Sequence, residues 1–400
     1  MGKIVFIHPD LGIGGAERAV VDAALALQSR GHRVELITSH HDPGHSFQET
    51  KDGTLQVTVV GDWLPRHVFG RCFAACAYLR MIYAAVYLVF FSGRRPDVVF
   101  CDQISACIPV LKLSSAKVIF YCHFPDLLLT DRKTFWKRVY RAPIDYLEER
   151  TTGMADCVLV NSQFTASVFR DTFKSLQQIK PEVIYPIPDF SSFDKPTDPA
   201  TQDLLPAQVH TVFLSLNRYE RKKNVQLAIY AFGELLQQKP DADVHLIIAG
   251  GYDSRVEENV EYHSELVTLA EKLGLEKKVT FLRSPSDSQK RTLLKESSCL
   301  LYTPEREHFG IVPIEAMYMH CPVIAMRSGG PLETVADGST GFLCDSEPGA
   351  VARAMLEFVE NPSLGKSFGE AGRNRVNTMF SFVTFTDKLD TIVHNLITGG

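Results

Sequence analysis

The chain has 400 residues, of which 45% are hydrophobic and 22% are charged. This composition excludes a disordered protein, because so apolar a chain can bury enough surface to offset the entropy lost on ordering, and the length predicts two or three domains. The formal net charge of −5 argues against a general nucleic-acid-binding protein, which would be more basic. Nine cysteines without a CxxC pair favour a reducing compartment.

The first half of the chain alternates apolar runs with helical patterns. It opens directly into an expected strand, so no signal peptide is predicted. Between the first two strands, Ala16–Arg30 has apolar residues at helical spacing. Continuous apolar strands separated by helices are typical of a parallel sheet covered on both faces. The expected strands are Lys3–His8, Arg33–Ser39, Leu55–Val60, Asp97–Cys101, Lys117–Cys122, Cys157–Val160 and Glu182–Tyr185.

A polar stretch then separates this half from a second one. Residues 186–208 contain five prolines and show no periodicity, which indicates a linker. The alternation resumes afterwards, with expected strands at His210–Leu216, Val244–Gly250, Lys278–Leu282, Cys299–Tyr302 and Pro322–Met326. The expected helices between them are Val225–Gln238, Val256–Leu273 and Ile311–His320.

This pattern predicts the α/β class, with two Rossmann-like, doubly wound parallel-sheet domains that face each other across a cleft. The first domain is expected at residues 1–188, the linker at 189–208 and the second domain at 209–400. The amphipathic tail Ala350–Ile397 is expected to close the second domain, and its last helix is a candidate to cross back to the first.

Cations follow the first strand of the second half. Residues 217–224 (NRYERKKN) place Arg218 and Lys223 five positions apart. Ligands of open α/β sheets bind beyond the carboxyl ends of the strands. The two cations could therefore close on a diphosphate, with a bidentate fork from arginine and a point charge from lysine. The alternative interpretation is a solvated run of charges.

Two glutamates flank the start of a later helix, directly after the strand Cys299–Tyr302. Gly310 between them permits a close approach of the backbone. The free N–H groups of a helix start attract anions such as phosphate, and the carboxylates of Glu307 and Glu315 are suited to hydrogen bonds with sugar hydroxyls. The alternative interpretation is a surface carboxylate and a helix cap.

Further motifs lie in both halves of the chain: Gly14-Gly15-Ala16-Glu17-Arg18, His123, Ser328-Gly329-Gly330-x-x-Glu333 and Asp337-Gly338-x-x-Gly341-Phe342. Together with the cations and the two glutamates, they resemble the family-four retaining glycosyltransferases over nearly the whole chain. That resemblance implies the GT-B fold, with an acceptor- and membrane-facing first domain and a nucleotide-sugar-binding second domain.

Longer segments are similar to the α-1,3/1,6-mannosyltransferases of dolichol-linked oligosaccharide assembly; they are residues 8–12 (HPDLG), 122–128 (CHFPDLL), 140–149, 217–224 and 307–310. This resemblance implies transfer of two mannoses from GDP-mannose, first α-1,3 and then α-1,6, with retention, to mannosyl-chitobiosyl-diphosphodolichol. It implies early steps of N-glycan precursor assembly at the cytosolic face of the endoplasmic reticulum membrane. The implied partners are this dolichyl-diphosphate oligosaccharide, GDP-mannose, a membrane surface and neighbouring mannosyltransferases of the pathway, with no nucleic acid.

The resemblance also implies a set of site residues. The catalytic set is Glu307, Lys223, Arg218 and His123, and the donor-binding set is Glu315, Gly310, Gly14, Gly15, Asn217 and Phe309. Within these sets, the two cations would neutralise the donor diphosphate. Glu315 would bind the ribose hydroxyls, and Glu307 the hydroxyls of the transferred sugar.

For the residues of these sets that lie in the first domain, a purely structural role is the alternative interpretation. His123 would hydrogen-bond the sugar near its anomeric carbon, or it is a satisfied histidine at the end of a strand. Gly14 and Gly15 would let the backbone approach a phosphate or the acceptor, or they form a plain strand-to-helix turn.

No metal or other cofactor is expected, and GDP-mannose is a substrate. The histidines form no HxxxH-type cluster, and the pattern Asp241-Ala242-Asp243 lies in a turn before an expected strand, away from any carboxyl end. The leaving phosphate oxygen would take the acceptor's proton during attack on the same face of the sugar.

An apolar run, Cys72–Ser92, is interrupted only by Arg80 before its terminal serine. As a helix its 21 residues would extend about 31 Å, enough to cross a bilayer. Crossing would, however, put strands of one sheet in different compartments. Two interpretations stay open: a helix buried in the first domain, or a helix in the membrane interface with arginines at the headgroups.

For the second interpretation, the candidate acceptor and membrane residues are Arg80, Arg94 and Trp136, and Arg71 and Arg95 would also meet headgroups. The basic stretch Arg132–Arg141 adds to that surface or is a solvated helix face. Two other functions also stay open: a related retaining glycosyltransferase that uses a UDP-sugar, and a non-catalytic sugar-nucleotide-binding scaffold. The intact cations and glutamates argue against the scaffold.

Overall fold

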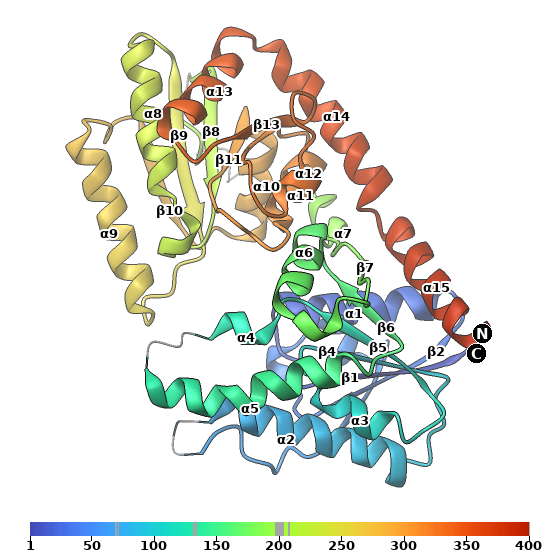
Figure 1. Cartoon of the computed structure of the whole chain (residues 1–400). Coiled ribbons are helices and arrows are strands. Elements are labelled where there is room, and N and C mark those ends of the chain that lie inside the picture. The colour runs from blue at the N-terminus through green and yellow to red at the C-terminus, as the bar shows by residue number, and fades with distance from the viewer. Residues whose placement is uncertain (69, 71, 131–133, 197–203, 207–208, 400) are drawn as a thin grey trace. The chain divides into compact units, whose positions relative to one another are not determined.

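The computed structural model describes residues 1–399 except 69, 71, 131–133, 197–203 and 207–208. The chain forms two compact units (Figure 1). Unit 1 contains Met1–Ile187 with Phe382–Gly400, and unit 2 contains Pro188–Ser381. Each unit is built around one parallel sheet, so the predicted α/β class with two doubly wound domains is confirmed.

The sheet of unit 1 has seven strands in the order β3-β2-β1-β4-β5-β6-β7. Its strands pair in parallel and are largely buried because helices cover both faces. They lie within two residues of the predicted positions. Their bounds are β1 Lys3–His8, β2 Arg33–Thr38, β3 Gln56–Val59, β4 Val98–Asp102, β5 Lys117–Cys122, β6 Cys157–Val160 and β7 Glu182–Val183.

Two hydrophobic clusters, one on each face of this sheet, hold the helices of unit 1 in place. The helices are α1 Gly15–Ser29, α2 Phe73–Val86, α3 Ile108–Leu111, α4 Asp126–Leu129, α5 Phe135–Thr152, α6 Gln163–Thr172 and α15 Phe382–Thr398. A π-helical turn, Tyr87–Phe91, extends α2.

The C-terminal helix α15 belongs to unit 1, where it packs against α1. Its apolar side chains join the same buried cluster as those of α1, and Asp390 accepts a hydrogen bond from His32 at 2.7 Å. Unit 2 therefore ends at Ser381 and not at residue 400. It begins at Pro188, so the described part of the stretch expected as a linker lies within its bounds, while residues 197–203 and 207–208 lie outside the described residues.

The sheet of unit 2 has six strands in the order β10-β9-β8-β11-β12-β13. The strands are β8 Thr211–Leu216, β9 Val244–Gly250, β10 Val279–Arg283, β11 Cys299–Tyr302, β12 Val323–Met326 and β13 Gly341–Cys344. The last of these was not predicted. It is short, and its first residue touches the backbone of β12 so closely that a Cβ on Gly341 would lie 1.8 Å from the Val323 oxygen.

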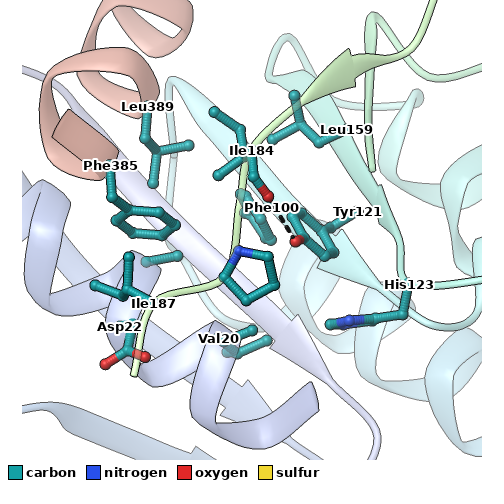
Figure 2. A pocket seen from close by; sticks show the side chains of 13 residues that line it. Val20, Asp22, Phe100, Tyr121, His123, Leu159, Ile184, Ile187, Phe385 and Leu389 are labelled. Carbon is teal, nitrogen blue, oxygen red and sulfur yellow. Dashed lines mark hydrogen bonds between the residues drawn. The ribbon is translucent and has the colours of Figure 1, made fainter. Parts of the chain in front are cut away.

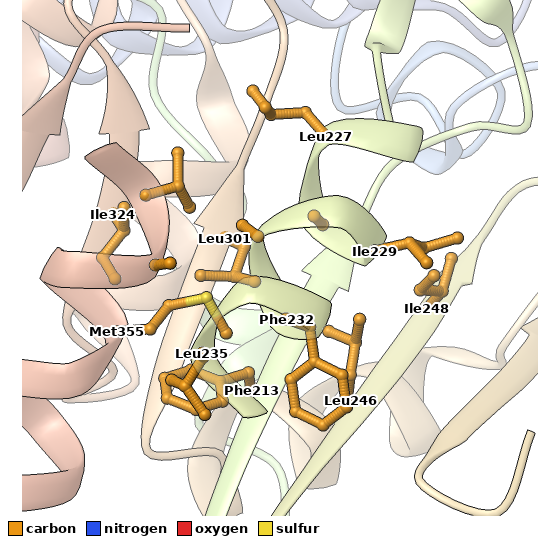
Figure 3. Close-up of a cluster of buried hydrophobic side chains, with 14 of the residues drawn as sticks. Phe213, Leu227, Ile229, Phe232, Leu235, Leu246, Ile248, Leu301, Ile324 and Met355 are labelled. Carbon is orange, nitrogen blue, oxygen red and sulfur yellow. The ribbon is translucent and has the colours of Figure 1, made fainter. Parts of the chain in front are cut away.

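The core of unit 2 lies between this sheet and its helices, where Phe213, Phe232 and Leu246 pack together (Figure 3). Helix α13 packs against α8 over this core. The helices are α7 Phe190–Phe193, α8 Gln226–Gln238, α9 Glu257–Lys272, α10 Asp287–Glu296, α11 Ile311–Tyr318, α12 Pro331–Thr334, α13 Pro348–Glu360 and α14 Ser363–Met379.

Both sheets reverse their strand order at one point, between β1 and β4 in unit 1 and between β8 and β11 in unit 2. The loops that leave the two strands at such a point diverge to opposite faces of the sheet. The crevice between them, beyond the carboxyl ends, is where open α/β sheets bind ligands.

Candidate active site

In unit 2, the reversal point brings a predicted cation and a predicted carboxylate together. Lys223 ends a single 3₁₀ turn, Arg221–Lys223, after β8, and Glu307 lies in the loop after β11. The Lys223 Nζ atom lies 2.5 Å from Glu307 Oε2. The Thr303 hydroxyl donates to the Lys223 carbonyl oxygen at 2.8 Å, which ties the two loops together.

The two other predicted residues of the loop after β8 have different surroundings. Arg218 is 65% exposed and pairs with Glu220, with 3.1 Å between the guanidinium and the carboxylate. Asn217 is buried, and its amide donates to the Ser215 hydroxyl at 3.4 Å. The structure thus brings Lys223 to Glu307 but directs the Arg218 head group to solvent.

The loop that carries Glu307 rests on the glycine motif after β12. The Gly330 N–H donates to the Glu307 carbonyl at 2.8 Å, and the Arg306 N–H donates to the Ser328 hydroxyl at 3.0 Å. A Cβ on Gly329 would lie 2.5 Å from the Glu307 oxygen. Only glycines permit backbone to pack on backbone this closely, which explains why this site needs the motif.

Helix α11 begins beside this loop. Gly310 precedes it with a φ of +80°, a left-handed conformation that favours glycine. Phe309 is buried and meets Phe380 edge to face at 6.0 Å between ring centroids, which anchors the helix start. Among the described residues, no side chain caps this helix at Gly310, so its first turn is suited to an anion.

Glu315, on α11, has a partner that sequence reasoning missed. Its buried carboxylate lies 2.7 Å from the Lys290 ammonium, and Lys290 projects from α10 over the ring of Phe193 at 5.4 Å. Burial raises the pKa of Glu315, and the charge of Lys290 opposes that rise. No motif contained Lys290, because only the packing of α10 against α11 brings it to Glu315.

In unit 1, three polar side chains meet at the reversal point, and only one of them was predicted. Asp102 ends β4, His8 ends β1, and His123 follows β5 directly. One carboxylate oxygen of Asp102 lies 2.7 Å from His8 Nδ1, and the other lies 3.0 Å from His123 Nε2. Figure 2 shows the His123 ring at the edge of a mostly apolar pocket, beside Tyr121. His8 and Asp102 could have been found from their places at the ends of adjacent strands.

These groups carry buried charge. Burial alone would disfavour the charged form of His8, but the carboxylates of Asp102 and Glu17 together outweigh it and raise the His8 pKa to about 10. Burial likewise opposes ionisation of Asp102, yet the charge of His8 and the hydrogen bond from His123 hold its pKa below the usual value. At neutral pH the pair is therefore a buried imidazolium and carboxylate.

The predicted glycines lie at the start of α1. Gly14 precedes the helix, and a Cβ there would lie 2.2 Å from the Glu17 carboxylate. The same carboxylate lies 3.8 Å from His8 Nε2. This carboxylate is the far end of a flexible side chain, and a Cβ on Gly15 would meet no described atom within 4 Å, so close packing in this structure accounts for neither glycine.

Two of the three residues predicted at a membrane surface are engaged inside the unit instead. Arg80 is 5% exposed and donates to the Ser39 carbonyl at 2.8 Å. Arg94 donates to Glu35 at 2.7 Å. Both arginines therefore have partners within the fold, and their contact with lipid headgroups stays a prediction. Trp136, on α5, is 78% exposed.

Helix α2 is buried on one side and exposes apolar side chains on the other. The segment Phe73–Phe91 is long and apolar enough to span a membrane, and it is the one such helix in the described part of the chain. The strands before and after this helix lie in one sheet, and 39% of its most apolar stretch is buried in the protein. Its other face exposes Phe73, Leu79, Tyr83, Phe90 and Phe91.

Helix α5 lies beside α2 (Figure 1) and also exposes apolar side chains. The Ala75 N–H of α2 donates to the Tyr140 hydroxyl of α5 at 3.1 Å, and the two helices lie next to each other in unit 1 (Figure 1). The exposed apolar residues of α5 include Phe135, Trp136, Val139 and Tyr146. Arg71 and Arg132, which the sequence also assigned to this surface, lie outside the described residues.

Comparisons with known proteins match both units of the chain. The family model described as Glycosyltransferase Family 4 matches residues 13–190, and the model described as Glycosyl transferases group 1 matches residues 200–375. The alpha-1,3/1,6-mannosyltransferase ALG2 of Homo sapiens is 54% identical, over 99% of this chain and 96% of the relative. That of Dictyostelium discoideum is 47% identical, over 98% of each.

The chain belongs to the alpha-1,3/1,6-mannosyltransferase family. The resemblance predicted from the sequence motifs is thereby confirmed, as is the prediction of an enzyme of the glycosyltransferase class.

Solved structures agree on the fold. Sucrose-phosphate synthase from Thermosynechococcus elongatus superposes with a TM-score of 0.76 at 20% identity, with all of both chains covered. Anabaena Alr3699/HepE in complex with UDP gives 0.75 at 20% identity, over 98% of this chain and 100% of that one. Such neighbours show the fold, and the predicted GT-B fold is confirmed for this mannosyltransferase family member.

Proposed function

We propose that the chain transfers two mannoses from GDP-mannose to mannosyl-chitobiosyl-diphosphodolichol, first in α-1,3 and then in α-1,6 linkage, with retention of configuration. Membership of the alpha-1,3/1,6-mannosyltransferase family is the support for mannosyl transfer itself. The single structural observation in support is the contact between Lys223 and Glu307 at the reversal point of the second sheet, where an open α/β fold receives its ligand.

On the donor side, the Lys223 ammonium and the start of α11 would neutralise the diphosphate and the charge that develops on it as it leaves. Arg218, exposed on the same loop as Lys223, would add a bidentate contact to the same phosphates. Glu307 would then exchange its lysine partner for the hydroxyls of the transferred mannose. Glu315, buried on α11, would accept hydrogen bonds from the ribose hydroxyls.

The chemistry would need no metal cofactor, since fixed cations and a helix start supply the positive charge at the phosphates. The acceptor hydroxyl would attack the face of the mannose from which the diphosphate leaves, and the leaving phosphate oxygen would take the hydroxyl proton. His123, exposed in part beside the buried Asp102, would hydrogen-bond the sugar near its anomeric carbon.

The exposed apolar face of α2 and α5 supports a place at the membrane interface. Aromatic and aliphatic side chains from both helices form it, and amphipathic surfaces of this kind lie in the headgroup region of a bilayer. The acceptor carries a polyprenyl chain, so we place the enzyme at the cytosolic face of the endoplasmic reticulum membrane, where it could meet neighbouring mannosyltransferases of the pathway.

A radiolabelled transfer assay tests the proposal. Purified protein in liposomes receives GDP-mannose and a polyprenyl-diphosphate chitobiosyl mannose, and the products are sized by chromatography. The proposal expects stepwise gain of two mannoses, with inhibition by GDP and not by UDP. Transfer from a UDP-sugar alone would overturn the donor assignment, and binding of a nucleotide sugar without any transfer would favour the non-catalytic scaffold.

A further inference from the structure

Asp102 is the most deeply buried carboxylate among the groups at the edge of the first sheet. Its side chain is 1% exposed, and both of its oxygens are engaged, one by His8 and the other by His123. The aromatic ring of Tyr121 on β5 packs against the His123 ring at 4.6 Å between centroids. Glu17 on α1 faces the far side of His8. Hydrogen bonds to His8 and His123 fix the position of this enclosed carboxylate, and the carboxylate in turn fixes the orientation of the two imidazole rings.

The charge of Asp102 decides how His123 shares its proton. An ionised carboxylate can only accept hydrogen bonds, and the buried His8 imidazolium keeps Asp102 ionised at neutral pH. His123 must therefore donate from Nε2, the atom 3.0 Å from Asp102. In a neutral imidazole the other nitrogen then carries a lone pair.

The remaining nitrogen of His123 is available to a ligand. Three contacts hold the residue: Asn161 donates to its backbone carbonyl at 3.0 Å, Tyr121 packs on the ring, and Asp102 binds Nε2. Within the described part of the chain, no hydrogen bond engages Nδ1, and the side chain is partly exposed. A hydroxyl group can donate to this atom.

We propose that Asp102 is a positioning residue: it fixes the His123 ring with the proton on Nε2, so that Nδ1 accepts a hydrogen bond from a sugar hydroxyl in the reaction. His8 is the counter-ion that makes the buried Asp102 carboxylate tolerable, because an unpaired buried charge is strongly destabilising. The inference rests on the proposed function, in which His123 contacts the sugar. It adds the residue that selects the tautomer.

A double-mutant cycle in the transfer assay tests this coupling. In Asp102→Asn, the amide that replaces one oxygen can donate to His123 Nε2 and move the ring proton to Nδ1. The expected result is a fall in kcat of roughly ten- to a hundredfold with little change in the KM for donor, the pattern of an interaction made in the transition state. His123→Ala should fall at least as far. Asp102→Asn should add little to it, because coupled residues are not additive.

The matched control is Asp390→Asn. This residue also accepts a hydrogen bond from a histidine, His32, at 2.7 Å. His32, however, directly precedes β2 and so lies at the amino ends of the strands, away from Asp102 at their carboxyl ends. The control should retain the wild-type kcat. Full activity in His123→Ala would overturn both the proposed role of His123 and this inference. A defective His123→Ala beside an unaffected Asp102→Asn, or two effects that multiply, would overturn the inference alone.

The tautomer can also be observed without a variant at Asp102, should that variant fail to fold. Protein labelled with ¹⁵N-histidine gives two-bond ¹H–¹⁵N correlations that distinguish the two tautomers, and the His123 signals are identified by their loss in His123→Gln. The inference expects a protonated Nε2 and an unprotonated Nδ1 at neutral pH. The opposite tautomer, or protonation of both nitrogens, would overturn it.

Discussion

The two units place charged groups at the same point of the same sheet topology, yet they hold them in opposite ways. In unit 1, Asp102 and His8 end strands and are almost completely buried. In unit 2, Lys223 and Glu307 lie in loops after strands and are partly exposed. His8 and Asp102 are held by the strands themselves, whereas Lys223 and Glu307 are held by the two loops that follow β8 and β11.

This difference separates charges that shape a site from charges that bind a ligand. A buried pair compensates its own desolvation and cannot exchange its partner without leaving an uncompensated charge. In the partly exposed pair, an incoming phosphate would replace one anion with another, so the charge of Lys223 would stay compensated. On the proposed function, Lys223 in unit 2 is therefore an exchangeable cation, whereas His8 and Asp102 in unit 1 form a fixed electrostatic frame.

The largest expected effect comes from removing the exchangeable cation. Lys223→Ala should lower turnover by roughly two orders of magnitude or more, because it removes a charge that stabilises the leaving diphosphate. The measurement is kcat in the transfer assay. The matched control is Lys222→Ala, since that neighbouring side chain is 68% exposed and pairs with Glu220. Near-normal turnover in Lys223→Ala would remove the diphosphate role.

The buried pair of His8 and Asp102 should make the free energy of unfolding depend on pH. The folded pKa of His8 is raised to about 10, above its unfolded value near 6.5. The contribution of His8 is then fully present below pH 6.5 and is lost as the pH rises toward 10, by at most about 1.4 kcal/mol per pH unit. Between pH 7 and 9, urea unfolding of the wild type should weaken more than that of His8→Gln. Equal slopes would contradict a charged His8.

A smaller effect is expected at the second carboxylate of unit 2. In Lys290→Met, the buried Glu315 loses the charge that opposes the rise of its pKa, so more of it is protonated and fewer carboxylates accept from the ribose. The KM for donor should rise about tenfold with kcat little changed, and more steeply at low pH. Lys295→Met, on the exposed face of the same helix, is the control. An unchanged KM would show that Lys290 does not support donor binding.

The smallest effect concerns the start of the helix that carries Lys290. The Ser286 hydroxyl accepts from the Gln289 N–H at 3.2 Å, and the Gln289 side chain accepts from the Ser286 N–H, which forms a capping box. Ser286→Ala should lower the free energy of unfolding by about 1 kcal/mol, measured by urea denaturation, while kcat stays near the wild-type value. A large loss of kcat would mean that the donor site depends on this helix end more than the loop contacts indicate.

Much of the fold follows from local patterns. Buried parallel strands read as continuous apolar runs, so β1, β5, β9 and β11 lie where the sequence predicts them. The sequence did not predict the short strand β13, because its pairing depends on a glycine that packs against a strand distant in the sequence. For α15 the sequence left two placements open, in the second domain or crossing back to the first, because an amphipathic pattern shows that one face of a helix is buried but not which surface covers it.

The sequence by itself determined the family, the two sheets and the residues whose types suit phosphate and sugar chemistry, because spacing along the chain preserves motifs and periodicity. Only the tertiary structure decided which charges meet. Asp102 and His8 are 94 residues apart, and Lys223 and Glu307 are 84 apart. Each pair forms because parallel strands bring their carboxyl ends to one edge. The same packing turns Arg80 inward and joins Lys290 to Glu315, since a side chain's partner is set by the element packed against it.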